Sequence, residues 1–257
     1  MIGEPQPSLR SLPPRGRTVR RSCVPAAVRA RGSRMTAFIF DIDGTIIDSM
    51  RHHERSWDVF LARRGVPTAG EDFFRRTAGR TGIEVMRELF GPLSDADAHA
   101  FVRGKEGIYR ELFRPGFREI EGFKAFARDA KTAGVRLACA TAGDPDNIAF
   151  ALGGLEMETF FDTAVGAHDV ARGKPEPDLF LLAANHLGAR PEECLVFEDA
   201  PLGIEAARRA GMRAVAIAST VPMDELGAPA HVVASAQDYT TLDAKALAAH
   251  LLGSSRP

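Results

Sequence analysis

The stretch AFIFDIDGT, residues 37–45, joins a short apolar run to two carboxylates and a glycine. The run AFIF has the length and the unbroken apolar character of a strand that is covered on both faces. Ligands of open parallel sheets bind at the carboxyl ends of such strands, so Asp41 and Asp43 lie where a site is expected. An extended backbone points them to opposite sides, but Gly44 allows a tight turn that bends Asp43 back over the site.

Two neighbouring carboxylates of this kind have a chemical use. One can attack a phosphorus atom while the other handles the proton of the leaving or entering oxygen. Taken alone, however, acidic residues followed by glycine also form ordinary turns. The chemical interpretation therefore depends on the rest of the chain.

Further apolar runs are also short enough for buried strands, at residues 135–140, 163–167, 194–197, 213–218 and 231–234. Helix-like segments occur among these runs, near residues 122–133, 145–152, 177–187 and 200–210. Strands that alternate with helices form a parallel sheet covered on both faces. The sequence therefore predicts an α/β fold with a doubly wound, Rossmann-like core.

Residues 49–118 are the exception, because they contain amphipathic helical stretches and no strand-like run. A segment of this size after the first strand is interpreted as an inserted, all-helical cap domain. The core is then formed by residues 35–48 together with 119–257. Pro115 and Gly116 are the expected return hinge.

Residues 1–34 differ in composition from the rest of the chain. They hold eight Arg and one Glu, are rich in Pro and Ser, and lack apolar periodicity. We expect a disordered leader. It is either an Arg-rich transit peptide or an untranslated stretch, with translation beginning at Met35.

The rest of the chain is acidic, which excludes several classes of protein. From Met35 onward it carries 25 basic and 33 acidic residues, which argues against a nucleic-acid-binding surface. The sequence contains no apolar run of about 18 residues, the length that a membrane-spanning helix needs. Cys23, Cys139 and Cys194 show no CxxC spacing and fit neither a disulfide framework nor a zinc site. We expect a cytoplasmic protein, monomeric or weakly homo-oligomeric, with Cys139 and Cys194 buried.

Two polar motifs follow predicted strands or open predicted helices. Thr141 precedes Ala142 and Gly143, and its hydroxyl and the nearby backbone N–H groups can hold phosphate oxygens. The alternative is a simple helix cap by Thr141 or Asp144. Lys174 lies in a Pro-containing loop that opens a helix. It can neutralise a nucleophile and a phosphoryl group, and the alternative is an ordinary surface Lys.

Another motif, Glu198-Asp199, follows the apolar run Leu195-Val196-Phe197. Paired acids at such a position are costly unless a cation or hydrogen bonds satisfy them. Oxygen ligands suit a hard ion, so Mg²⁺ is the expected cofactor. A helix cap by Asp199 is compatible with metal binding.

Taken in order, these motifs resemble those of the haloacid dehalogenase superfamily of phosphotransferases. The resemblance covers about residues 37–217 and is carried by Asp41/Asp43, Thr141, Lys174 and Glu198/Asp199. It implies a helical cap at residues 49–118 and a reaction through an aspartyl-phosphate. True dehalogenases lack the second Asp, so the presence of Asp43 favours phosphoryl transfer.

The resemblance also implies a role for each residue. Asp41 is the nucleophile, and Asp43 is the general acid/base. Thr141 and Lys174 bind phosphoryl oxygens. Three small residues are expected to meet the substrate as well: Gly44, Ala142 and Gly143.

For the metal, the resemblance implies that Mg²⁺ is held by the carboxylates of Asp41 and Asp199 and by the carbonyl of Asp43. Glu198 is expected to assist in binding the ion.

Within the superfamily, His53 and Trp57 stand where the subgroup of β-phosphoglucomutase and sugar-phosphate phosphatases has a His and a Trp. At positions i and i+4 they share one helix face, which would place His53 near the pocket. The alternative is a partly exposed His beside a core Trp. Arg80 and Lys105 are expected to contact the substrate from the cap.

One departure bears on the reaction. Mutases of this type commonly have a Ser-rich loop with Lys and Asn after the Thr/Ser motif, whereas this chain has Asp144 and Asp146. Two carboxylates would repel a second phosphate. We therefore predict a Mg²⁺-dependent phosphatase for a small phosphorylated metabolite, most simply a sugar phosphate. The alternatives are a β-phosphoglucomutase-like isomerase and a catalytically silent binding protein.

Overall fold

The computed structural model describes residues 35–67, 73, 76–77, 80–227 and 229–253. All of these belong to one compact unit, Arg34–Pro257. The predicted leader at residues 1–34, including Cys23, lies outside the described residues.

The core is a six-stranded sheet with the order β3-β2-β1-β4-β5-β6, in which neighbouring strands are parallel. Its strands are β1 Ala37–Phe40, β2 Arg136–Ala140, β3 Thr163–Val165, β4 Cys194–Glu198, β5 Arg213–Ile217 and β6 Val232–Ala236. Each corresponds to one predicted apolar run. Because β1 lies between β2 and β4, the residues that follow these three strands meet at one edge of the sheet.

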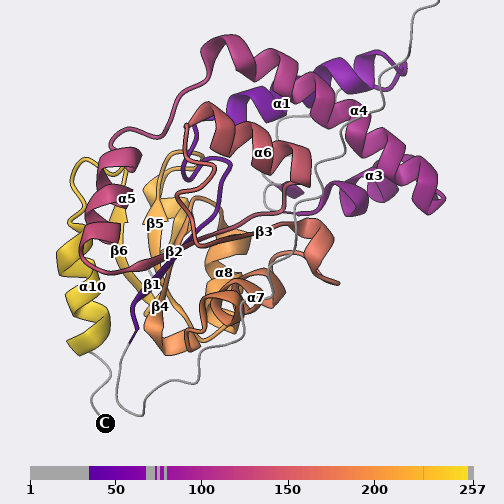
Figure 1. The fold of residues 1–257 in the computed structure, drawn as a ribbon. Helices are drawn as coiled ribbons and strands as arrows, with labels where there is room; N and C mark the ends of the chain where they lie inside the picture. Colours follow the sequence, from indigo (N-terminus) through magenta and orange to yellow (C-terminus); the bar gives the residue numbers. More distant parts are fainter. Residues whose placement is uncertain (1–34, 68–72, 74–75, 78–79, 228, 254–257) are drawn as a thin grey trace, which may run out of the picture. The chain divides into compact units, whose positions relative to one another are not determined.

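Helices cover both faces of the sheet (Figure 1). Phe38 and Phe40 of β1 point into an apolar cluster that they share with α5 (Phe123–Thr132) and α10 (Ala244–Gly253). Ala37 and Ile39 point into a second cluster, shared with α7 (Asp178–Leu187) and α8 (Pro201–Arg209). This alternation is the two-residue period of a strand that is buried on both sides. The predicted doubly wound α/β core is confirmed. Cys139 and Cys194 are buried free thiols, as predicted.

The helices of the core follow the predicted segments closely. Their bounds are α5 Phe123–Thr132, α6 Pro145–Gly154, α7 Asp178–Leu187, α8 Pro201–Arg209, α9 Met223–Leu226 and α10 Ala244–Gly253. The described residues also contain three short 3₁₀ turns, η1 Arg114–Gly116, η2 Ala167–Asp169 and η3 Pro191–Glu193. The turn η2 shows why β3 is shorter than the predicted run, since Ala167 already belongs to a helical turn. Helices α9 and α10 are not among the predicted elements.

The described part of residues 49–118 contains helices and no strand of the sheet. They are α1 Met50–Ala62, α3 Gly82–Phe90 and α4 Asp95–Phe113, and they share an apolar cluster around Phe60 and Met86. The two connections to the core run side by side, because Ile47 forms an antiparallel bridge with Glu119. These contacts support our proposal that residues 49–118 form a cap. The predicted hinge residues Pro115 and Gly116 lie in η1.

No helix among the described residues is both long and apolar enough to cross a membrane.

Candidate active site

Asp41 is the first residue after β1 and is buried, with 6% of its surface exposed. Its backbone N–H donates to the carbonyl of Phe197 on the neighbouring strand at 3.0 Å, which fixes the backbone at the sheet edge. Its Oδ1 accepts a hydrogen bond from Lys174 Nζ at 2.5 Å. Residues 133 positions apart in sequence thus form a buried ion pair.

Lys174 stands between two carboxylates. Its Nζ donates to Asp41 and also to Glu198, and its side chain is almost completely buried. Burial lowers the pKa of the ammonium, but Asp41 and Glu198 outweigh burial, so the net pKa lies above its ordinary value. Lys174 is therefore a fixed cation and not a surface Lys.

Glu198 faces Lys174 and the backbone. One carboxylate oxygen accepts the bond from Lys174, and the other accepts the N–H groups of Asp199 at 3.0 Å and Ala200 at 3.1 Å. The sequence predicts Glu198 as an assisting metal ligand, but both of its oxygens already have protein partners. Its geometry fits the positioning of Lys174 better.

Asp199 follows Glu198 in the sequence and is also buried. Its two oxygens accept hydrogen bonds from the hydroxyl groups of Thr45, at 3.0 Å, and Thr220. Burial and the charge of Glu198 raise the pKa of Asp199 to about 7, although both hydroxyl groups lower it. A carboxylate in this setting is stabilised in its ionised form by a nearby cation.

Gly44 makes room for Asp199. Its φ of +78° is in the left-handed region, and a Cβ there would overlap both Asp199 and Thr220. The predicted turn at Gly44 is confirmed. Gly44, which the sequence predicts to meet the substrate, does not line the cavity around Asp41 and Asp43.

Asp41 and Asp199 are the two carboxylates that the sequence predicts as metal ligands. Burial raises the pKa of Asp41 well above its ordinary value; Lys174 lowers it, while Glu198 and Asp199 raise it again. The described residues contain no group of three or more His, Cys, Asp or Glu side chains arranged to hold an ion. Asp41 and Asp199 supply two buried carboxylates, and such hard oxygen ligands fit an Mg²⁺ that keeps several waters.

Three side chains surround Oδ1 of Asp43. Its Oδ1 accepts hydrogen bonds from Ser49 at 2.7 Å and from Tyr109 at 3.0 Å, and it lies 3.0 Å from Nε2 of His53. Burial raises the pKa of Asp43, but these three partners outweigh burial and lower it to about 2. The carboxylate of Asp43 is therefore ionised in this arrangement.

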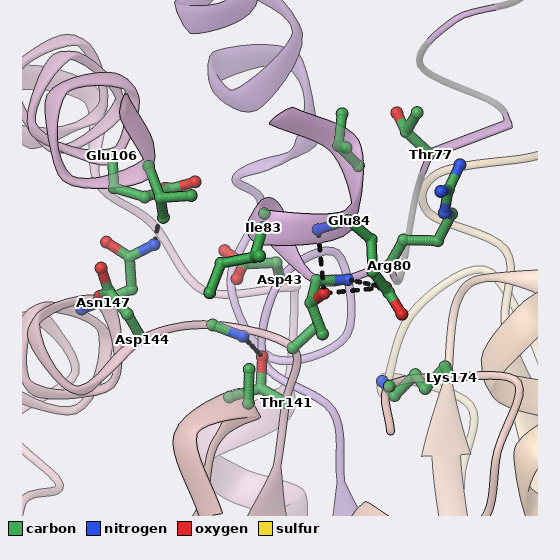
Figure 2. A pocket seen from close by; sticks show the side chains of 18 of the residues that line it. Asp43, Thr77, Arg80, Ile83, Glu84, Glu106, Thr141, Asp144, Asn147 and Lys174 are labelled. Carbon is green, nitrogen blue, oxygen red and sulfur yellow. Dashed lines mark hydrogen bonds between the residues drawn. The ribbon is translucent and has the colours of Figure 1, made fainter. Parts of the chain in front are cut away.

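Thr141 follows β2 and is almost completely buried. Its Oγ1 accepts the N–H of Gly143 at 3.0 Å, as the dashed line in Figure 2 marks. The helix cap belongs to Asp144, whose Oδ1 accepts the N–H of Asn147 at 2.8 Å. Thr141, Ala142 and Gly143 all line the cavity, so the cap alternative applies to Asp144 and not to Thr141.

A cavity of about 660 Å³ joins these groups to residues 49–118. Asp41, Asp43 and Lys174 line it from the core. In Figure 2, Arg80 and Ile83, near the start of α3, lie on the other side of it from Thr141 and Lys174. Residues of the sheet edge and residues of the helical segment thus line one space.

The predicted cap residues all line this cavity, but their charges are already paired. Lys105 is 2% exposed and bonds to Nδ1 of His53 at 2.7 Å and to Glu106 at 3.0 Å. Arg80 donates to Glu88 at 2.7 Å. That Lys105 and Arg80 contact a substrate stays a prediction.

His53 lies in the cavity and stacks on the ring of Tyr109, with the centroids 3.7 Å apart. Trp57, one turn further along α1, packs in the apolar cluster of the helical segment. The two share one side of α1, and His53 faces Asp43 and not solvent. The interpretation of His53 as a pocket residue therefore fits this structure better than the alternative.

Sequence reasoning missed Tyr109 and Ser49, the two hydroxyl groups that bind Asp43. Tyr109 is four residues after Lys105 and so lies on the same face of α4, which is a signal that the spacing contains. Ser49 precedes α1 and looks like its N-cap, but it makes no capping hydrogen bond there. Its hydroxyl turns to Asp43 instead.

Comparison with known proteins gives a family match over most of the chain. Residues 35–211 match the model of the haloacid dehalogenase-like hydrolases. Hexitol phosphatase A of Escherichia coli K12 is 34% identical over 186 residues, which covers 72% of this chain and 83% of that protein. Fructose-1-phosphate phosphatase of the same organism is 33% identical over 183 residues, covering 71% of this chain and 96% of that protein.

Solved structures show the same fold. β-Phosphoglucomutase from Clostridium difficile has a TM-score of 0.75, covering 86% of this chain and 98% of that chain. Its sequence identity is 21%, so this likeness concerns the fold alone.

Proposed function

Because the chain belongs to the haloacid dehalogenase-like hydrolases, we propose that it is a Mg²⁺-dependent phosphatase that cleaves small sugar phosphates through an aspartyl-phosphate on Asp41. The observation that carries this proposal is the contact between Asp41 and Lys174 at 2.5 Å, on the wall of a cavity shared with Asp43 and Thr141. A nucleophile, a cation, a proton carrier and a phosphate-binding hydroxyl thus line one enclosed space. The enzyme class, a hydrolase of phosphoric monoesters, agrees with the phosphatases that the chain resembles.

In the first step, a carboxylate oxygen of Asp41 attacks phosphorus. A new O–P bond forms as the bond from phosphorus to the sugar oxygen breaks. That oxygen leaves with a proton from Asp43. A bound phosphate would raise the pKa of Asp43 by like-charge repulsion, which favours the protonated form needed here.

In the second step, water attacks the phosphorus of the aspartyl-phosphate. Asp43 takes the proton of the water, inorganic phosphate leaves, and the Asp41 carboxylate is restored. Thr141 and Lys174 hold the phosphoryl oxygens in both steps. Mg²⁺, held by Asp41, Asp199 and the Asp43 carbonyl, would screen the repulsion between carboxylate and phosphate.

A sugar phosphate is the proposed substrate class for two reasons. The relatives reported above are phosphatases named for a hexitol and for fructose 1-phosphate. In addition, a cavity of about 660 Å³ lies within the range of small-molecule sites.

The mutase alternative requires a place for a second phosphate. Asp144 and Asp146, next to Thr141, carry two negative charges, and Arg110 lies 3.7 Å and 3.6 Å from them. One guanidinium is shared between two carboxylates, so the loop has no surplus positive charge for a second phosphate. This supports a hydrolase over a mutase.

The proposal is tested by phosphate release from hexitol, ketose and aldose phosphates, with and without Mg²⁺, for the full chain and for Asp41→Asn. Release that needs Mg²⁺ and is lost in Asp41→Asn supports the proposal. Interconversion of hexose 1- and 6-phosphates in the presence of bisphosphate, without phosphate release, would instead identify a mutase.

A further inference from the structure

Asn147 joins two helices that lie far apart in the sequence. It lies on α6, six residues after Thr141, and only 4% of its surface is exposed. Its side-chain amide donates to Oε2 of Glu106 at 2.7 Å, and its carbonyl accepts from Arg110 at 2.6 Å (Figure 2 shows the first contact). Both partners are on α4. Both the amide and the carbonyl of the Asn147 side chain therefore bond to α4.

Glu106 contacts both Asn147 and Lys105. Its Oε2 is bound to Asn147, and its Oε1 accepts from Lys105 Nζ at 3.0 Å. Burial raises the pKa of Glu106, but Lys105, His53 and Asn147 outweigh burial and lower it. Glu106 is therefore the buried counterion of a lysine that is itself 2% exposed.

Lys105 in turn determines how His53 faces Asp43. An ammonium group has only donor hydrogens, so Nδ1 of His53, 2.7 Å away, must be the acceptor. The ring proton then resides on Nε2, the nitrogen that lies 3.0 Å from Oδ1 of Asp43. The same ring stacks on Tyr109, which donates to the same oxygen.

We propose that Glu106, fixed by Asn147, is a positioning residue for Asp43, acting through Lys105 and the tautomer of His53. The inference rests on the proposed function, because the role of Asp43 belongs to it. Without the charge of Glu106, Lys105 is a buried cation with no carboxylate partner and no longer stays as a donor beside Nδ1. His53 then loses its fixed tautomer, and Asp43 loses the fixed N–H group that lies 3.0 Å from its Oδ1.

The first test measures kinetics in Glu106→Gln, which keeps the size of the side chain and removes its charge. We expect kcat on a sugar phosphate to fall by about tenfold or more, within the range of general acid–base contributions. The inhibition constant for inorganic phosphate should change by less than about threefold, because Thr141 and Lys174 are untouched. A general loss of site structure would weaken phosphate binding as well, and that outcome would overturn the proposal.

Arg110→Gln is the matched control. It weakens the same junction between α4 and α6, but Arg110 does not contact Lys105. If it lowers kcat as much as Glu106→Gln does, the effect comes from the junction alone and the positioning role is wrong. An unchanged kcat in Glu106→Gln overturns it too.

A second test needs no turnover. The ¹⁵N chemical shifts of the His53 ring, assigned by comparison with His53→Asn, report which nitrogen carries the proton. We expect the Nε2-protonated form in the full chain and a mixture of forms in Glu106→Gln. Identical shifts in the two proteins contradict the proposal. If no sugar phosphate is hydrolysed by the unmodified protein, the proposed function fails, while this measurement still decides the positioning role.

Discussion

A side chain at Gly203, on α8, would overlap the carboxyl group of Glu198, the last residue of β4. Gly203 is therefore what allows Glu198 to reach Lys174. Gly203 thus affects Asp41 indirectly, through the side chains of Glu198 and Lys174.

Gly203→Ala is expected to displace Glu198 and, with it, Lys174. A misplacement of about 1 Å near the reacting atoms costs on the order of 100-fold in rate, so kcat should fall by about 10- to 100-fold. The overpacked site should also lose about 1–3 kcal/mol of stability. Phosphate-release kinetics and thermal unfolding measure the two effects.

Gly107→Ala is the control for this substitution. Gly107 is also a helical glycine, but no atom lies near the position of an added Cβ. Alanine there should leave kcat unchanged and stabilise the protein by roughly 0.5–1 kcal/mol. If both alanines behave alike, the overlap with Glu198 has no functional consequence.

Asp199→Asn should weaken the response to Mg²⁺. Burial and the charge of Glu198 raise the pKa of Asp199 to about 7. The substitution removes the charge of Asp199 and with it the repulsion from Glu198. We expect half-maximal activity to need at least about tenfold more Mg²⁺. In the absence of metal, the variant should be no less stable than the unmodified protein, because a repulsion is lost.

Thermal unfolding with and without Mg²⁺ checks this prediction. The ion should raise the unfolding temperature of the unmodified protein and have little effect on Asp199→Asn. Asp146→Asn is the control, since Asp146 is exposed in the same cavity but outside the proposed ligand set. An equal Mg²⁺ response in all three proteins would show that Asp199 does not hold the ion.

The stability supplied by Glu106 should depend on pH. The pKa of Glu106 lies below its ordinary value of 4.5 in the folded protein, because Lys105, His53 and Asn147 outweigh the effect of burial. A group whose pKa is lowered on folding adds stability above its unfolded pKa, and this contribution is lost as the pH falls through the folded pKa. Glu106→Gln should therefore be less stable by about 3 kcal/mol near pH 7.

Denaturant unfolding of both proteins between neutral pH and pH 3 measures this effect. The difference between them should shrink as the pH falls below 4.5. A difference that stays constant over this range would mean that Glu106 stabilises the fold through packing and not through its charge.

The sequence is sufficient for most of the core because its signals are local. An apolar run such as residues 37–40 shows a buried strand, and parallel pairing brings Asp41, Thr141 and Asp199 to one edge wherever the strands lie. Gly44 likewise predicts the tight turn in which it lies. The motifs are therefore visible before any long-range contact is known.

The contacts between side chains cannot be predicted from local signals, because they join residues far apart in sequence. Nothing near Glu198 shows that its carboxylate pairs with Lys174, 24 positions earlier. Similarly, Asn147 and Glu106 are 41 positions apart, on helices whose packing only the fold determines. Helix α10 was missed because its run of Ala and Leu has no clear polar face.

The contact between Gly173 and Thr81 joins the Lys174 loop to the start of α3. A Cβ on Gly173 would lie 2.7 Å from Cγ2 of Thr81, and its other neighbours are at least 3.5 Å away. Gly173→Ala should therefore push the cap side of the cavity outward and lower kcat/KM by about tenfold. Thr81→Ser removes only the obstructing methyl group and keeps the hydroxyl that caps α3 with Glu84. The double variant should regain most of the activity. If the loss in the double variant is instead the sum of the losses in the two single variants, the contact with the Thr81 methyl group is not the cause of the defect.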